Sequence, residues 1–223
     1  MKSLLKRLLG TRRVVRFFTP IPGERRAFLL EMLPKCSVGA EIGVHMGDFS
    51  QEILRIVKPV TLHLIDPWKH EDSATYKEAW YGGKAKGEQS ELDARYEAVL
   101  RRFGPAIDSG QVKVHRGYSQ HVAESFPNGY FDWVYIDGNH LYEFVRKDLL
   151  LYFHKVKDGG YLTGDDCGEG GWWNGGVKKA VDEFILSNPF ELVRITNNQF
   201  LLKKLAIPGS TCTSLPAGVR GST

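Results

Sequence analysis

Two adjacent carboxylates at the end of an apolar stretch raise the first chemical question in this sequence. The stretch is YLTGDDC, residues 161–167, and it carries Asp165 and Asp166 side by side. Like charges this close repel each other unless a cation lies between them or in front of them. A third carboxylate, Asp137, ends another apolar run, WVYID. The sequence therefore requires a partner that compensates these charges.

A second group of residues has the composition of a nucleoside-binding site. AEIGVHMGDFS places Glu41, Gly43 and Gly47 where an apolar run gives way to a helical pattern. Glycine lets a backbone approach a ligand closely, and the amino end of a helix offers free N–H groups. Asp66 ends the next apolar run, about 20 residues later, where dinucleotide folds bind the ribose hydroxyls. The glycine spacing is not the G-x-G-x-x-G of nicotinamide binders, so a different nucleoside ligand is indicated.

An α/β sheet is the arrangement that would bring these residues to one edge. Short apolar runs alternate with segments of helical period, which predicts parallel strand–helix units. We expect Asp48 to cap the helix after the first run, with Gln51 completing the cap, and only Asp148 breaks the apolar stripe of the helix after the fourth. The polar span 69–90 is expected to be a mobile lid over a site or a partner-binding insertion. The predicted strands cover residues 38–43, 60–66, 112–117, 133–137 and 160–166.

The glycine turn, the acid ending the second strand and the turn GYSQH after the third together resemble class I S-adenosylmethionine-dependent methyltransferases. The resemblance covers residues 37–204 and implies a single-domain Rossmann-like fold with a mostly parallel seven-stranded sheet. Its last two strands, ELVRI and QFLLKK, would form a C-terminal antiparallel hairpin. The cofactor that it implies is S-adenosylmethionine, with Gly43 and Gly47 bordering the methionine part, Glu41 near its amino group, Asp66 on the ribose, and Ser119 with Gln120 at the adenine.

The stretches YIDGNHLYEFVRKDL, GGYLTGDDC and GGVKKAVDEF resemble small-molecule O-methyltransferases of the macrocin and catechol types. In those families an acid ending the fourth strand and two acidic or amide residues ending the fifth bind magnesium. The resemblance thus implies a divalent metal, Mg²⁺, on Asp137, Asp165 and Asp166. Such an ion would remove the repulsion between the carboxylates and lower the pKa of an acceptor hydroxyl. The alternative is that Asp165 caps a loop, Asp166 caps the next helix, and no metal binds.

His140 is the second candidate for proton chemistry, and we take His140 and Asp137 as the predicted catalytic residues. His140 follows Asp137 by three residues and sits where catechol-type enzymes carry a lysine base. Histidine titrates near neutrality, so it could accept the proton of a substrate hydroxyl. A structural histidine at a helix start is the alternative. Trp172 and Trp173 follow the acidic pair and could stack on substrate or pack beneath the lid.

The expected activity is transfer of a methyl group from S-adenosylmethionine to a hydroxyl of a small molecule, such as a sugar or another natural product. One alternative is a metal-independent methyltransferase with His140 as the base. Another is a nucleic-acid methyltransferase whose basic N-terminal stretch follows the phosphates, although interleaved aromatic residues for base stacking are absent. A non-catalytic nucleoside-binding module is the third, and the three aspartates argue against it.

Composition and chain ends complete the expectations. We predict a basic helical segment over residues 1–36, the methyltransferase domain over 37–204 and a disordered tail over 205–223, rich in Gly, Ser, Thr and Pro. No apolar run approaches the roughly 20 residues of a membrane span, so stable membrane insertion is not expected. The 3 cysteines show no paired spacing, which indicates a reducing compartment such as the cytoplasm. The expected partner is the small-molecule acceptor, and no nucleic acid is expected. A homo-oligomer is possible on the sequence alone.

Overall fold

A seven-stranded sheet forms the centre of the computed structural model, which describes residues 26–206. Each of the five predicted apolar runs falls on a strand, and the predicted final hairpin is present. The fifth strand begins before its predicted start because the ladder shifts register beside the Gly159–Gly160 pair and continues through it. The strands are β1 (Val38–Ile42), β2 (Thr61–Asp66), β3 (Val112–Arg116), β4 (Phe131–Ile136), β5 (Val156–Gly164), β6 (Phe190–Thr196) and β7 (Gln199–Lys204).

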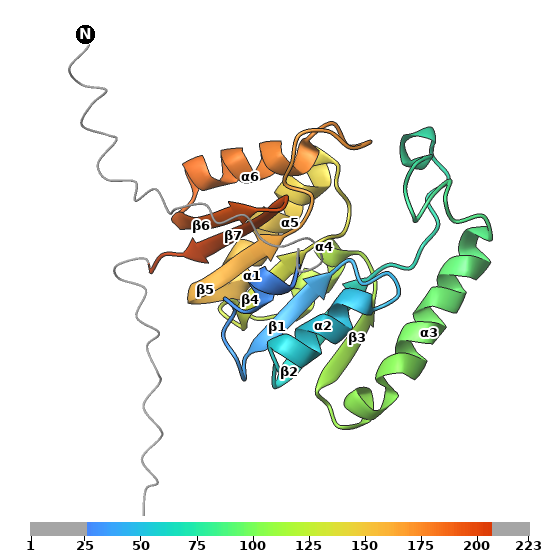
Figure 1. Ribbon diagram of the computed structural model, residues 1–223, viewed down its shortest axis with the longest axis horizontal. Coiled ribbons are helices and arrows are strands. Elements are labelled where there is room, and N and C mark those ends of the chain that lie inside the picture. The colour runs from blue at the N-terminus through green and yellow to red at the C-terminus, as the bar shows by residue number, and fades with distance from the viewer. Residues whose placement is uncertain (1–25, 207–223) are drawn as a thin grey trace, which may run out of the picture.

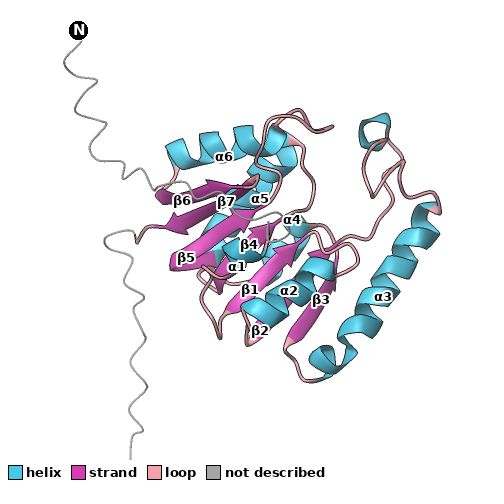
Figure 2. Cartoon of the chain, in the orientation of Figure 1, coloured by secondary structure: helices cyan, strands magenta, loops and turns pink. Residues whose placement is uncertain are grey.

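The strand order is β3-β2-β1-β4-β5-β7-β6, and Figures 1 and 2 show the resulting twisted sheet. The pairs among β1 to β5 are parallel, whereas β7 runs antiparallel to both of its neighbours. This confirms the predicted Rossmann-like α/β fold with its C-terminal antiparallel hairpin. The order reverses between β1 and β4, and open α/β sheets bind ligands at the carboxyl ends of strands at such a point.

Helices cover both faces of the sheet, so β1, β2 and β4 are buried along almost their whole length. The helices are α1 (Ala27–Leu30), α2 (Asp48–Ile56), α3 (Glu88–Asp108), α4 (Ser119–Val122), α5 (Tyr142–Lys155) and α6 (Gly176–Ser187). One apolar core lies against α1, α2 and α3, and contains Ile53 and Val99. The other lies against α5 and α6, and contains Leu149 and Val181; Figure 1 shows α2 and α5 on opposite faces.

The predicted cap of α2 is wrong in its details. The residue that caps α2 is Gly47, which has a left-handed φ of 80° and no side-chain cap, and Asp48 is already the first helical residue. Asp48 and Gln51 instead both accept from the guanidinium of Arg102 on α3. The sequence has the pattern of a capping box, but both side chains bind Arg102, which is distant in the sequence, instead of the backbone N–H groups of α2.

The ends of the chain limit what can be said of the predicted N-terminal and C-terminal segments. Residues 1–25 and 207–223 lie outside the described part, so the basic segment and the tail stay predictions apart from the short helix α1. Among the helices of residues 26–206, none combines the length and the apolar composition needed to cross a membrane.

Candidate active site at the carboxyl ends of the strands

The glycine turn after β1 touches the loop that follows β4. Gly43 has a φ of 89°, and a Cβ placed on it would lie 2.0 Å from the carbonyl oxygen of Asp137. At Gly47 a Cβ would lie 2.6 Å from the ring of Phe103. Both positions therefore require glycine for backbone reasons alone. Their predicted place beside the methionine part of the cofactor stays a prediction.

Asp66 is a buried carboxylate at the end of β2, and both of its oxygens accept hydrogen bonds. Its Oδ2 accepts from the backbone N–H groups of Val44 and His45, at 2.8 and 3.0 Å, and from the hydroxyl of Tyr81. Its Oδ1 accepts from the N–H of Trp68 at 2.7 Å. Burial raises the pKa of Asp66, and these donors oppose the shift. The predicted ribose acceptor thus fixes the glycine turn and is covered by a tyrosine from the segment 69–90.

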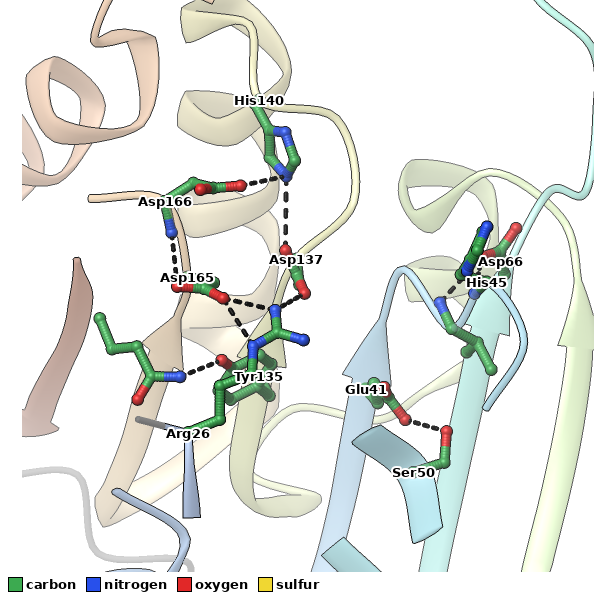
Figure 3. A network of polar contacts seen from close by, with 12 residues as sticks. Arg26, Glu41, His45, Ser50, Asp66, Tyr135, Asp137, His140, Asp165 and Asp166 are labelled. Atoms are coloured by element: carbon green, nitrogen blue, oxygen red, sulfur yellow. Dashed lines mark hydrogen bonds and ion pairs between the residues drawn. The ribbon is translucent and has the colours of Figure 1, made fainter. Parts of the chain in front are cut away.

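Glu41 lies at the same edge on β1 and is buried, with 1% of its surface exposed. The hydroxyl of Ser50 on α2 donates to its Oε2 at 2.5 Å (Figure 3). Burial raises the pKa of Glu41 to about 8, against the effect of the Ser50 hydrogen bond. A buried acid of this kind becomes ionised when a cation is brought to it, which is compatible with its predicted place near the amino group of the cofactor.

The predicted adenine residues are organised by α5. Ser119 and Gln120 both donate to Oδ1 of Asp148, at 2.6 and 2.9 Å, and the hydroxyl of Tyr152 donates to the carbonyl of Ser119 at 3.0 Å. Burial raises the pKa of Asp148 to about 6. These contacts explain why an acid interrupts the apolar stripe of α5: it orders the turn that begins α4. A contact of Ser119 and Gln120 with adenine stays a prediction.

The acidic rim consists of Asp137 after β4 and of Asp165 and Asp166 after β5. The strands end side by side, since the N–H of Asp165 donates to the carbonyl of Ile136 at 3.2 Å. A guanidinium lies at one side of the rim: Nε of Arg26 donates to Oδ2 of Asp165 at 2.6 Å, and its Nη2 contacts Oδ2 of Asp137 (Figure 3). Burial raises the pKa of Asp165, as does Asp137, while Arg26 opposes the shift. Arg26 is thus a cation that compensates Asp137 and Asp165.

His140 lies at the other side of the rim, where the structure groups it with two of the three aspartates. Its Nε2 is 3.4 Å from Oδ1 of Asp137 and 3.3 Å from Oδ2 of Asp166. Burial disfavours the imidazolium, but the hydrogen bond to Asp137 and the aspartate charges outweigh it and raise the pKa of His140. The ligand atoms of Asp137, His140 and Asp166 all lie within 4.8 Å of one another. Oxygen and imidazole nitrogen are both ligands of divalent metals, so this trio fits such an ion.

The structure does not bring Asp165 into this trio, because its Oδ2 faces Arg26 and its Oδ1 accepts from the N–H of Asp166 at 2.9 Å. The predicted ligand set of three aspartates therefore differs from the set that the geometry groups. The sequence reasoning also missed Arg26 and Tyr81. Arg26 is one of many basic residues near the start of the sequence. The sequence indicated that the adjacent carboxylates of Asp165 and Asp166 need a cation, but not which residue supplies it.

The segment 69–90 and the loop after β5 cover the rim with aromatic side chains. Asn139 donates to the hydroxyl of Tyr76 at 2.8 Å, and the Tyr76 ring meets Trp172 edge-on at 5.7 Å. The ring of Trp173 lies 4.8 Å from that of His140. The segment contacts both the Asp66 side and the Asp137 side, as a cover over the site would. Whether it moves, as a lid does, stays a prediction.

Comparison with known proteins gives both a family and a fold. A family model described as a methyltransferase domain matches residues 40–167, more than half of the chain. An uncharacterized protein of Acanthamoeba polyphaga mimivirus is 39% identical over 64 residues, a match that covers 29% of this chain and only 28% of that protein.

Two solved structures show the same fold at low identity. A protein from Corynebacterium glutamicum superposes with a TM-score of 0.58 and 18% identity, over 85% of this chain and 84% of the other. A protein from Streptococcus mutans, provisionally assigned as a methyltransferase and solved in complex with SAH, gives a TM-score of 0.54 and 12% identity, over 84% and 100%. At these identities the two structures show a shared fold and no more.

Proposed function

The chain belongs to the family of methyltransferase domains, with the class I S-adenosylmethionine-dependent fold, and we propose that it moves a methyl group from S-adenosylmethionine to a hydroxyl of a small molecule. The cofactor would lie across the glycine turn, with its ribose on Asp66 and its amino group near Glu41. Both carboxylates are buried at the carboxyl ends of neighbouring strands. The SAH complex of the Streptococcus mutans protein, which shares the fold, agrees with this choice of cofactor.

The observation that carries the proposal is the contact between the glycine turn and the acidic rim. The Cα of Gly43 packs on the carbonyl of Asp137 so closely that no side chain fits between them, and the N–H of Asp137 donates to the carbonyl of Ile42 at 2.8 Å. A methyl group presented at Gly43 would therefore face the rim. Holding donor and acceptor in such proximity is the main requirement of a displacement at carbon.

The reaction needs one proton acceptor. The hydroxyl oxygen attacks the methyl carbon, the carbon–sulfur bond breaks with its electron pair going to sulfur, and the hydroxyl proton must leave. Where no ion is bound at the rim, His140 is placed to accept that proton through Nε2. A divalent ion held by the rim carboxylates would lower the pKa of the acceptor hydroxyl when bound. The aromatic side chains of Tyr76, Trp172 and Trp173 suit a small acceptor that is enclosed against them.

Calorimetry with S-adenosylmethionine and its demethylated product tests the cofactor half of the proposal. We expect binding at micromolar strength and a loss of at least about tenfold in Asp66→Ala, because the ribose hydroxyls lose a charged acceptor. The exposed α2 variant Glu52→Gln, which only loses an ion pair with Arg55, should bind as the wild type does. Folded wild-type protein that binds neither ligand would overturn the proposal.

Transfer of a labelled methyl group to a panel of small hydroxyl compounds and cell extract tests the acceptor half. We expect His140→Ala to remove most transfer at saturating cofactor while cofactor affinity stays within about threefold. Product formation only on nucleic acid, with binding that weakens steeply as salt is raised, would refute a small-molecule acceptor.

A further inference from the structure

The acidic rim contains two separate positions for a cation, and Asp137 takes part in both. Its Oδ2 faces Arg26, whereas its Oδ1 faces Nε2 of His140. Asp165 belongs only to the Arg26 side, and Asp166 only to the His140 side (Figure 3). The two positions therefore use different oxygens and can be filled at the same time.

Arg26 fills the first position as a built-in cation. Its Nε and Nη2 reach the same oxygen of Asp165, at 2.6 and 2.5 Å, and its guanidinium lies 4.7 Å above the ring of Phe49. The side chains of Asp137 and Asp165 are only 14% and 17% exposed. A guanidinium bound by two partly buried carboxylates and stacked on an aromatic ring is held more firmly than a surface ion pair.

The second position has the geometry of a metal site. Nε2 of His140 lies 3.4 and 3.3 Å from one oxygen each of Asp137 and Asp166. Ligand atoms that share an ion at about 2.1 Å lie about 3.0 to 3.4 Å apart in octahedral or tetrahedral coordination. The ligand atoms of all three side chains lie within 4.8 Å of one another. A single N–H of an imidazole cannot point at both carboxylates, whereas an ion that draws the three side chains together can be shared by them.

Charge supports the same division. The three ionised aspartates carry three negative charges, and Arg26 compensates one of them. An imidazole that binds an ion through Nε2 is neutral, so two negative charges then remain for a divalent ion to compensate. Arg26 and a divalent ion are thus complementary at this rim and need not compete for it.

We propose that the rim binds a divalent ion through Asp137, His140 and Asp166, with Arg26 taking the place of the metal at Asp165. Because imidazole favours first-row transition metals over Mg²⁺, the site prefers an ion such as Mn²⁺ or Zn²⁺. With the ion bound, Nε2 of His140 is a ligand, and the proton of the acceptor hydroxyl, whose pKa the ion would lower, passes to solvent water instead. The inference rests on the proposed function only in assigning the rim to the acceptor, since ion binding is measurable without methyl transfer.

Calorimetric titration of the full chain with Mn²⁺, Zn²⁺ and Mg²⁺ tests the proposal. We expect Mn²⁺ and Zn²⁺ to bind at least about tenfold more tightly than Mg²⁺. His140→Ala and Asp166→Asn should each weaken Mn²⁺ binding by at least about tenfold, whereas Asp165→Asn should change it by less than about threefold. Loss of Mn²⁺ binding in Asp165→Asn, with binding retained in His140→Ala, would restore the three-aspartate site and overturn the proposal.

Pulsed electron paramagnetic resonance of the Mn²⁺-loaded protein gives a second readout. Nitrogen modulation should be present in the wild type and in Arg26→Ala, which keeps Asp137, His140 and Asp166, and absent in His140→Ala. No modulation in the wild type, or no ion binding by folded wild-type protein, would overturn the assignment. Binding of S-adenosylhomocysteine, measured on the same samples, separates the two failures, because it tests the proposed function without involving the ion.

Discussion

Asp137 connects the parts of the site through three of its atoms. Its carbonyl oxygen packs against Gly43, its Oδ2 accepts from Arg26, and its Oδ1 faces His140. A substitution here keeps the carbonyl contact with Gly43 but removes the carboxylate that binds the guanidinium and the proposed ion together. Variants of Asp165 and Asp166, which each belong to one side only, are therefore more informative than variants of Asp137.

Glu41 should make cofactor binding depend on pH. Its raised pKa of about 8 means that it is mostly protonated at pH 6 and mostly ionised at pH 9. If the ionised form pairs with the amino group of the cofactor, affinity for S-adenosylhomocysteine should rise with pH between about 6 and 8, by at most tenfold per unit. Glu41→Gln, which keeps an oxygen for Ser50, should bind more weakly and with little dependence on pH over that range.

Calorimetry in two buffers of different ionisation enthalpy checks this expectation directly. Near pH 7 the wild type should release close to one proton on binding S-adenosylhomocysteine, and Glu41→Gln should release none. Equal proton release by both proteins would show that Glu41 does not face the amino group. Ser50→Ala is the matched control, because it should change the pKa of Glu41 while leaving the carboxylate in place.

At the scale of elements, the segment 69–90 would compete with the proposed cofactor for one oxygen of Asp66. Oδ2 already accepts the N–H groups of Val44 and His45 and the hydroxyl of Tyr81, which leaves it no free acceptor position. Oδ1 accepts the N–H of Trp68 and keeps one position. A ribose that places its two hydroxyls on both oxygens of Asp66 can therefore bind only where the Tyr81 hydroxyl gives way.

Tyr81→Phe should tighten cofactor binding. Removing the hydroxyl frees an acceptor position on Asp66, and a hydrogen bond to a charged group contributes about 1.5–3 kcal/mol, which corresponds to roughly 10- to 150-fold in affinity as an upper range. Calorimetry with S-adenosylhomocysteine measures the change. Tyr76→Phe in the same segment removes a contact with Asn139 only and should have little effect. Weaker binding by Tyr81→Phe would show instead that the hydroxyl belongs to the bound state.

Element by element, apolar periodicity predicted the strands well, because burial on both faces leaves continuous apolar runs in the sequence. It could not predict Arg26 at the rim, since the two carboxylates that it contacts lie 111 and 139 residues further along the chain. The predicted cap of α2 was wrong for the same reason, because Asp48 and Gln51, the side chains of the expected capping box, bind Arg102 on α3. Glycine positions and strand-end acids are local signals, whereas cation partners are set by the topology.

Across the whole molecule, a second group of titratable residues lies on β2 and β3, toward the β3 edge of the sheet and separated by β1 from the strands of the acidic rim. His63 on β2 is buried; its Nδ1 lies 2.9 Å from Nε2 of His115 on β3, and its Nε2 lies 3.2 Å from the hydroxyl of Tyr130. The rings of Phe126 and Phe131 meet it edge-on. Both rings pack among aromatic side chains, and burial of His63 couples the stability of the protein to pH.

His63 should make the folded protein less stable as the pH falls. Burial, together with His115 and Lys113, lowers the pKa of His63 from 6.5 to about 3. Above pH 6.5 the side chain is neutral in both states and adds no pH dependence. Between pH 6.5 and 3 the unfolded chain binds a proton that the folded chain does not, so the free energy of unfolding decreases by up to about 1.4 kcal/mol per pH unit as the pH falls.

Chemical denaturation at pH 7.5, 6.0 and 5.0 should show this slope reduced by about one proton in His63→Asn and unchanged in the exposed control His121→Asn. Equal slopes in His63→Asn and the wild type would mean that the buried histidine keeps its proton through folding.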